Sequence, residues 1–178
     1  MSFATPSQAG SLSREQTAVA YEKHHVAKGN YSGEWGTLAD HFAEDAAYYD
    51  VFYGWQYGRP AIRAFLINAM KGIEDWSFPV QWQVVSEGRV IAHWMNRLPG
   101  KRPDGTYFEF PGVSVITYNA KGEIIEQMDI YNGISAIKVV TEARTGVLGR
   151  AFFGLFGWLG TVGREGMRLV YTVFGGKK

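Results

Sequence analysis

Residues 42–65 read FAEDAAYYDVFYGWQYGRPAIRAF, and the expected fold is built around this stretch. The pattern predicts the end of a helix, then a tyrosine-rich strand over residues 46–51. Gly54 and Gly58 punctuate the loop that follows. Apolar residues then recur at helical spacing over residues 60–72, with a proline where the first turn of a helix tolerates it.

A carboxylate at the end of the predicted strand is the first candidate for chemistry. Asp50 is followed by several aromatic residues, and Tyr48 lies two positions earlier, on the same face of the strand. Rings around a carboxyl group raise its pKa, which is typical of a general acid or base.

The flanking sequence predicts helices first and antiparallel strands afterwards. Ser13 and Gln16 form a capping-box pattern at the start of a helix that runs to about Lys28, and a second helix is predicted over residues 33–43. Strands are predicted over residues 78–86, 90–98, 107–118 and 123–132. This order of elements indicates an α+β fold.

Two short segments carry a family resemblance. FAEDA at residues 42–46 and GRPAI at residues 58–62 resemble the nuclear transport factor 2-like superfamily, in its SnoaL-like branch. That branch includes ketosteroid isomerase, limonene epoxide hydrolase, scytalone dehydratase and the polyketide cyclases. The resemblance extends to about Tyr131. It implies a strongly curved mixed or antiparallel sheet wrapped around N-terminal helices into a cone with one open mouth. It does not specify the reaction, because this fold carries many chemistries.

The domain organisation follows from the extent of the resemblance. We expect a disordered leader over residues 1–12, a cone domain over 13–145 and a glycine-rich, apolar helical extension over 146–178. In the extension, glycine recurs every third residue from Gly154 to Gly166. This segment is only marginally long enough for a membrane span and contains Arg150. We therefore expect a lid over the cone mouth or a dimer clasp, with peripheral membrane contact as an alternative.

Composition excludes several classes of protein. The chain has 178 residues, a net charge of +1 and no cysteine. These values give no basic field for nucleic acid, and they exclude disulfides and thiol catalysis. The first residues lack the basic and apolar regions of a signal peptide, so we expect a cytoplasmic protein. No metal-ligand or phosphate-loop spacing is present, so we expect a cofactor-free site without a metal.

Strand periodicity assigns the two faces of the last strand. One face carries Ile125, Gln127, Asp129 and Tyr131, and the other carries Ile124, Glu126, Met128 and Ile130. Aspartate disfavours strands and is rarely buried without a partner, so its face is expected to line the pocket. The opposite, apolar face is expected to form a homodimer.

The resemblance implies roles for individual residues. Asp50 aligns with the base of the isomerase, Asp129 with the base of the hydrolase, and Tyr48 with a tyrosine that holds the hydrolase's water. Trp94 and Asn96 stand where the hydrolase has an arginine and a second aspartate, so its triad is incomplete here. The predicted catalytic residues are Asp129, as principal acid or base, with Asp50, Tyr48 and Asn96. The predicted substrate-binding residues are Trp94, Phe108, Phe110, Tyr131, Ser114, Tyr53 and Trp55 at the rim, and His24 or His25.

Each candidate also has a structural interpretation. Asp50 could cap the adjacent loop through backbone N–H groups. Asp129 could form an ion pair with a cation, for which the candidates are His93, Arg97 and Lys138. Trp94 and the two phenylalanines could be ordinary core, and the two histidines ordinary surface or core residues.

Two classes of function fit this sequence. The first is a cofactor-independent acid/base enzyme for a small hydrophobic, aromatic or polycyclic substrate. Isomerisation, dehydration, cyclisation, epoxide opening and retro-aldol release of an aldehyde need the same parts: a base, a proton donor and a ring-lined cavity. The second is a binding protein or dimeric scaffold without catalysis. Polar groups that converge inside the cavity would favour the enzyme.

Overall fold

A computed structural model describes residues 12–29 and 34–145 of the chain. The predicted leader, apart from Leu12, and the predicted extension over 146–178 lie outside the described residues. The chain divides into two compact units, Met1–Gly133 and Ile134–Lys178.

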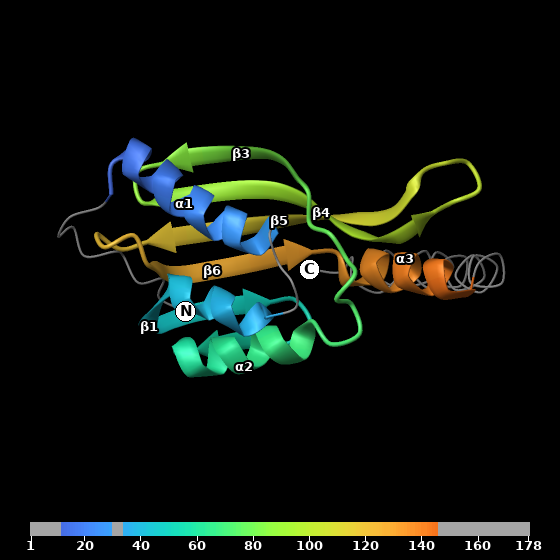
Figure 1. Cartoon of the computed structure of the whole chain (residues 1–178), viewed down its shortest axis with the longest axis horizontal. Coiled ribbons are helices and arrows are strands. Elements are labelled where there is room, and N and C mark those ends of the chain that lie inside the picture. Colours follow the sequence, from blue (N-terminus) through green and yellow to red (C-terminus); the bar gives the residue numbers. More distant parts are fainter. Residues whose placement is uncertain (1–11, 30–33, 146–178) are drawn as a thin grey trace, which may run out of the picture. The chain divides into compact units, whose positions relative to one another are not determined.

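The described residues of the first unit form three helices and a six-stranded sheet, arranged as in Figure 1. The helices are α1 (Arg14–Gly29), the 3-10 helix η1 (Trp35–His41) and α2 (Arg59–Ala69). The strands are β1 (Phe42–Asp50), β2 (Gly54–Tyr57), β3 (Val80–Ser86), β4 (Arg89–Lys101), β5 (Tyr107–Tyr118) and β6 (Ile124–Tyr131). The sheet order is β2-β1-β6-β5-β4-β3, in which β1 and β6 are parallel and the other neighbouring strands are antiparallel. The predicted α+β fold, with a curved mixed sheet and N-terminal helices, is confirmed.

The second unit contributes one described element, helix α3 (Gly133–Thr145). No element was predicted between the last strand and residue 146, so this helix is an addition to the expected fold. Within the described residues, no helix is both long enough and apolar enough to cross a membrane.

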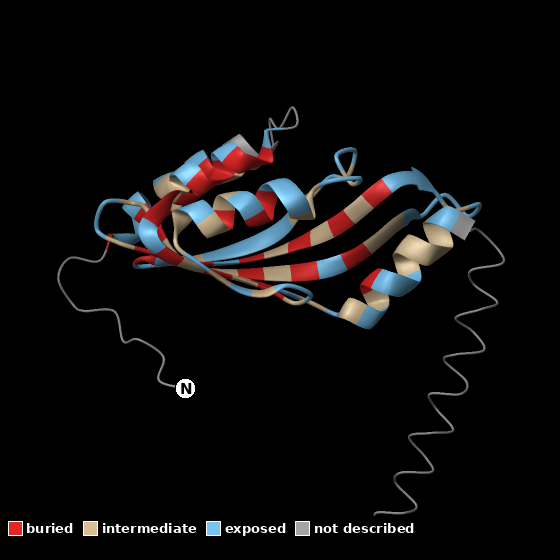
Figure 2. Ribbon diagram, turned by 90° about the horizontal axis from the view of Figure 1, so that it is seen from below, coloured by how far each residue is buried: buried red, intermediate tan, exposed pale blue. Residues whose placement is uncertain are grey.

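Helix α1 starts at the predicted capping box. The backbone N–H of Ser13 donates to Gln16 Oε1 at 2.9 Å, and the N–H of Gln16 donates to Ser13 Oγ at 3.2 Å. Thr17, Tyr21 and His24 are buried at positions one turn apart, so this face of the helix meets the sheet. Figure 2 shows the helices of this unit on one side of the sheet.

The helix predicted over 33–43 is present as a shorter 3-10 helix, but the segment FAEDA is the start of a strand and not the end of that helix. Strand β1 begins at Phe42, which pairs with Ile124 of β6. Phe42 is 1% exposed, while Glu44 and Asp45 point outward at a register shift in the β1–β6 pairing. Burial of Phe42 between the helices and the sheet therefore overrides the helical propensity of the Ala-Glu composition.

The loop after Asp50 contains a strand that was not predicted. Gly54 and Gly58 have φ angles of 72° and 81°, a conformation that other residues rarely adopt, and they bracket the four-residue β2. β2 pairs antiparallel with β1, so that Trp55 lies opposite Tyr49 and Gly54 opposite Asp50. Helix α2 follows at once, with Pro60 in its first turn as predicted.

The predicted antiparallel strands are confirmed with small changes at their ends. Gly88 and Gly122 take positive φ values in the predicted hairpin turns. β4 continues to Lys101, so the turn to β5 is shorter than the predicted connection over 99–105. Across this extended hairpin, Arg97 pairs with Glu109 at 2.7 Å.

One face of the sheet is buried beneath the helices. The buried positions on β4 and β5 alternate as expected: Val90, Ala92, Trp94, Asn96 and Leu98 on β4, and Phe110, Gly112, Ser114 and Ile116 on β5. Figure 2 shows this alternation along the strands. We call this side the inner face.

The start of β6 departs from the predicted alternation. Ile124 was assigned to the outer side together with Met128 and Ile130, but it is completely buried. The pairing of β5 with β6 shifts between Thr117 and Tyr118, and this irregularity turns Ile124 inward. Met128 and Ile130 keep their predicted outer positions.

The outer face carries an apolar row that crosses all six strands. The register of the sheet aligns Val84, Ile91, Val115, Met128, Tyr49 and Trp55 side by side. A neighbouring row contains Trp82, His93, Val113 and Ile130, and the rings of Trp82 and His93 stack at 5.3 Å. Val84 is 56% exposed and Trp82 52% exposed, so this face has large uncovered apolar groups.

Candidate active site

Three polar side chains form a row across the inner face. The register aligns Ser114 of β5 with Asp129 of β6, and Asp129 with Asp50 of β1. All three are buried. The parallel pairing of β1 with β6 thus places the two predicted catalytic aspartates on neighbouring strands, directly opposite each other.

Asp129 accepts hydrogen bonds from three neutral side chains. Tyr48 Oη donates to Oδ2 at 2.5 Å, while Ser114 Oγ and Gln127 Nε2 donate to Oδ1 at 2.6 and 2.9 Å. Two of the three cations proposed as alternative partners are engaged elsewhere, since Arg97 pairs with Glu109 and His93 stacks on Trp82.

Asp50 also accepts three hydrogen bonds, but two of them come from the backbone. The N–H groups of Phe52 and Tyr53 donate to Oδ1 at 2.8 and 3.2 Å, and Tyr131 Oη donates to Oδ2 at 2.9 Å. Asp50 therefore caps the β1–β2 turn, as its structural interpretation predicted, and at the same time faces the tyrosine.

Each aspartate is hydrogen-bonded to a tyrosine on the strand of the other aspartate. Asp129 on β6 is bonded to Tyr48 on β1, and Asp50 on β1 is bonded to Tyr131 on β6. An ionised carboxylate has about four acceptor positions, so each aspartate keeps about one for another proton donor.

Burial shifts the protonation equilibria in this cluster. Burial raises the pKa of Asp50, and the nearby charge of Asp129 adds to this rise, although the hydrogen bonds to Asp50 oppose it. Burial, together with the Asp129 carboxylate, raises the pKa of Tyr48 well above its usual value of 10. Burial and the Asp50 carboxylate raise the pKa of Tyr131 in the same direction. Both phenols therefore stay protonated at neutral pH and act as donors.

Trp94 supports Asp129 through Ser114. Its indole Nε1 donates to Ser114 Oγ at 2.9 Å, and the same oxygen donates to Asp129. The six-membered ring of Trp94 lies over Gly112, where an added Cβ would come within 2.7 Å of it. The missing side chain at Gly112 lets the indole reach across β5, so Trp94 holds the network in place instead of forming only a wall.

Rings continue from this network toward the β4–β5 hairpin. Phe110 lies 5.8 Å from the ring of Tyr131 and opposite Asn96 in the β4–β5 register. Both Asn96 and Phe110 are buried on the inner face. Phe108 shares their side of the strand but is only half-buried, and its ring lies under the guanidinium of Arg102 at 4.8 Å. It belongs to the hairpin end and not to the carboxylate network.

The two predicted rim residues, Tyr53 and Trp55, lie in different parts of the structure. Tyr53 packs against Phe65 of α2 at 5.4 Å and is 61% exposed, so it can stand at the edge of the site. The assignment of Trp55 to the rim is wrong. Trp55 lies opposite Tyr49 on the outer face, on the side of β1 away from Asp50, and its ring stacks on Tyr57.

The two histidines lie behind the network, at a small internal cavity. His24 is buried with its ring near those of His41 and Phe42, and His25 stacks on Tyr21. The cavity measures about 20 Å³, enough for about one water molecule. It is lined by Tyr21, His24, His25, Phe78, Val80, Ala92, Trp94, Ser114, Ile116 and Gln127. Burial raises the pKa of Tyr21 to about 12.

Gln127 was missing from the predicted site. Its amide donates to Asp129, and its Oε1 is buried without a hydrogen-bond partner. The alternation of β6 puts Gln127 on the same face as Asp129, two residues away. A polar residue at this spacing is the sequence signal that identifies Gln127 as part of the site.

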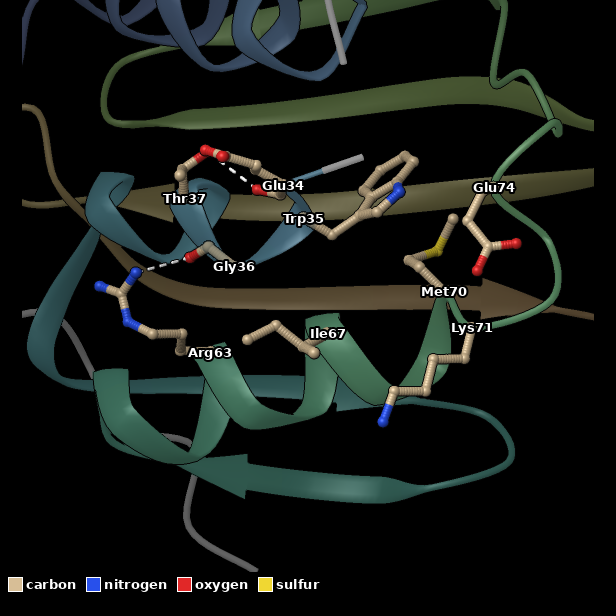
Figure 3. Close-up of a pocket in the computed structure, with 9 residues that line it drawn as sticks. All are labelled: Glu34, Trp35, Gly36, Thr37, Arg63, Ile67, Met70, Lys71 and Glu74. Atoms are coloured by element: carbon tan, nitrogen blue, oxygen red, sulfur yellow. Dashed lines mark hydrogen bonds between the residues drawn. The ribbon is translucent and has the colours of Figure 1, made fainter. Parts of the chain in front are cut away.

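A larger hollow lies away from the carboxylates. It measures about 460 Å³ and runs between η1 and α2 (Figure 3). Its lining is Glu34, Trp35, Gly36, Thr37, Arg63, Ile67, Met70, Lys71 and Glu74. Arg63 is already bound to the Gly36 carbonyl and to Asp40, both at 2.7 Å, and Lys71 donates to Asn68. Despite its size, this groove lacks convergent groups for acid/base chemistry.

The described residues contain no group of three or more histidine or acidic side chains that could hold a metal ion. The buried polar groups of the inner face are carboxylates, phenols, amides and hydroxyls, which suit proton transfer between organic groups.

Solved structures share this fold at low sequence identity. A protein from Shewanella putrefaciens CN-32, assigned as a SnoaL-like polyketide cyclase, aligns with a TM-score of 0.57 at 15% identity, over 70% of this chain and 85% of that chain. A protein assigned as a polyketide cyclase from Xanthomonas campestris pv. campestris aligns with a TM-score of 0.55 at 21% identity, over 71% and 98%. TerC, co-crystallised with polyporic acid, aligns with a TM-score of 0.55 at 14% identity, over 70% and 98%.

The comparison with functionally curated proteins gives no match. The SnoaL-like domain family matches residues 24–127, which is more than half of the chain. This match begins within α1 and ends within β6, two residues before Asp129. The chain belongs to the SnoaL-like domain family.

Proposed function

We propose that this protein is a cofactor-independent acid/base enzyme that acts on a small hydrophobic substrate with aromatic or fused rings. The reaction class is that of a lyase, isomerase, dehydratase or cyclase, with epoxide opening as a less favoured member. The observation that carries the proposal is the pair of buried aspartates in register on β1 and β6, each bonded to a tyrosine of the other strand.

In this proposal Asp129 is the principal base. Three donors fix its position, and one acceptor site remains for a substrate proton. Asp50 is the assisting acid, because a carboxyl group with a raised pKa can hold and return a proton at a higher pH than a free aspartate. Tyr48 stays protonated and steadies Asp129 as its charge changes.

Ring walls favour a planar, hydrophobic substrate. The rings of Phe110 and Tyr131 lie beside the aspartates, tilted at 52° to each other, and Tyr53 stands at the exposed side. The relatives assigned as polyketide cyclases, and the relative crystallised with polyporic acid, support a ring compound of this kind.

Proton abstraction can be tested without the natural substrate. 2-Tetralone has two fused rings and exchangeable hydrogens beside a ketone, so its exchange in D2O can be followed by NMR. We expect wild-type protein to accelerate exchange over buffer. Asp129→Asn keeps the shape but removes the base, and should lower the rate 10²–10⁴-fold. Circular dichroism checks that the variant is folded.

Asp50→Asn is the companion variant. A smaller loss than in Asp129→Asn fits a supporting role, whereas an equal loss fits two aspartates that act as a unit. A fully active Asp129→Asn would contradict the assignment and leave Asp50 as the better candidate for the base.

A non-catalytic carrier of ring compounds is the second candidate function. It is favoured by the donors that already fill three acceptor positions on each aspartate. Binding of 2-tetralone without accelerated exchange would support the carrier and contradict the enzyme.

A further inference from the structure

Asn96 is a buried amide whose donor group has no partner. Its side chain is on the inner face of β4, the residue is 6% exposed, and Nδ2 makes no hydrogen bond. A buried N–H without an acceptor lowers the stability of a folded protein, so such groups are uncommon and often serve function.

The surroundings of Asn96 are aromatic. Phe110 lies opposite it on β5, and Trp76 meets Phe110 edge to face at 6.2 Å. On its other side, Phe110 contacts Tyr131, which donates to Asp50. Ring contacts therefore connect Phe110, the residue opposite Asn96, with the tyrosine that is bonded to Asp50.

The sheet register gives the separation of Asn96 from Asp129. Ala92 shares a row with Ser114 and Asp129, and Asn96 lies four residues further along the same strand. Asn96 is also two strands away from Asp129, because β5 lies between β4 and β6. Four residues along the strand span about 13 Å and two strand spacings about 10 Å, so the two positions are roughly 16 Å apart. After about 3 Å for a hydrogen bond at each end, roughly 10 Å remain for the molecule between them. This length corresponds to about three fused six-membered rings.

We propose that Asn96 is a recognition residue that donates a hydrogen bond from Nδ2 to a neutral acceptor oxygen at the far end of the substrate. The ligand is then an elongated compound of about three fused rings with a ketone, quinone or ether oxygen at the Asn96 end. The opposite end faces Asp129 and Asp50. The identity of that end as the reacting one rests on the proposed function, whereas the binding role of Asn96 does not require turnover.

A matched pair of probes isolates the hydrogen bond. 2-Acetylnaphthalene and 2-ethylnaphthalene have the same ring system, but only the first carries an acceptor oxygen. Equilibrium dialysis of both compounds against the full chain measures the preference for the carbonyl compound. We expect wild-type protein to prefer it about fivefold, the usual effect of one hydrogen bond.

Asn96→Leu should remove this preference, because leucine is similar in size but cannot donate. The same variant without ligand should melt at the wild-type temperature or above, since it removes an unpartnered polar group. Thr117→Val is the control, a change from polar to apolar at another buried position of the sheet. It should leave the preference unchanged.

Three results would overturn the inference: an undiminished preference in Asn96→Leu, a clearly lower melting temperature of that variant, or no binding of either probe to wild-type protein. The exchange assay separates this inference from the proposed function. Exchange activity without an Asn96-dependent preference refutes the recognition role alone. An Asn96-dependent preference without exchange activity refutes the enzyme alone.

Discussion

Tyr48 donates a hydrogen bond of 2.5 Å to Asp129, although 81 positions separate the two residues in the chain. The bond crosses the parallel pair β1–β6. The ring of Tyr48 packs against that of Phe65 of α2 at 5.1 Å. Helix α2 therefore holds Tyr48 in place, and Tyr48 in turn holds the Asp129 carboxylate. The position of the proposed base thus depends on three elements and not on β6 alone.

Tyr48→Phe should destabilise the protein by about 1–3 kcal/mol, because a buried carboxylate loses one of its three donors while the ring packing remains. Urea unfolding measures the change. Tyr49→Phe is the matched control. Tyr49 follows Tyr48 on β1, but its side chain lies in the outer row and makes no bond to either aspartate. The control should change stability by less than about 0.5 kcal/mol. Equal effects of the two variants would contradict a structural role for the Tyr48–Asp129 bond.

Asp50→Asn should change the pH dependence of stability. The pKa of Asp50 is raised above 3.8, so the folded state binds its proton more tightly than the unfolded state. Wild-type stability from this group is therefore greatest in acid and falls as pH rises from 3.8 through the raised pKa. Asparagine does not titrate, so the stability of the variant relative to wild type should increase over the same window and then stay constant.

Urea unfolding of both proteins between about pH 4 and pH 8 tests this sign. A relative stability that is constant throughout, or that falls with rising pH, would show that Asp50 has no raised pKa. Asparagine can still accept the N–H groups of Phe52 and Tyr53, which keeps the turn intact in the comparison.

Gly112→Ala should force Trp94 out of its place, because the new Cβ would lie 2.7 Å from the indole ring. We expect a loss of about 1–3 kcal/mol, typical of overpacking. In the double variant Gly112→Ala/Trp94→Leu the added methyl group has room, so its loss should be smaller than the sum of the single losses. Additive losses in urea unfolding would show that Gly112 and Trp94 do not interact.

The outer apolar rows predict a homodimer through this face. The sequence indicates the same arrangement from Ile124, Met128 and Ile130, although Ile124 is buried inside the protein. A stable interface needs about 800 Å² per partner, and the apolar row extends across all six strands of the sheet. Light scattering at micromolar concentration should give the dimer mass for the wild type. Ile91→Glu, at an exposed position of the row, should give the monomer mass.

Val19→Glu is the control for this prediction. Val19 is 57% exposed on α1, away from the outer face, so the variant should remain a dimer. A monomeric wild type would contradict the prediction, as would a dimer that Ile91→Glu leaves intact.

The sequence predicted those parts of the site that depend on strand period. Alternation alone placed Asp129 with Gln127, and Trp94 with Asn96, on the inner face. Which strand lies beside which is a tertiary property, so the contact between Trp94 and Ser114 and the need for glycine at Gly112 were not predictable without the register.

The errors fall where tertiary pairing outweighs local signals. Residues 42–45 have helical composition, yet pairing with β6 makes them a strand. Ile124 follows the outer pattern by count, but a register shift turns it inward. The sequence pattern predicts a loop at residues 54–57, which would put Trp55 at the rim. In the strand β2, alternate side chains point to opposite faces of the sheet, and Trp55 lies opposite Tyr49 on the outer face.

The parallel pairing of β1 with β6 has a consequence for how the chain folds during synthesis on the ribosome. β1 is synthesised early, but β6, the strand it pairs with in parallel, is the last strand to be synthesised. In contrast, β4, β5 and β6 can form hairpins with their sequence neighbours as they emerge. Both aspartates meet only in that final step. The proposed acid/base pair is therefore complete only late in folding, and an incomplete chain can contain a formed hairpin while its two aspartates are still apart.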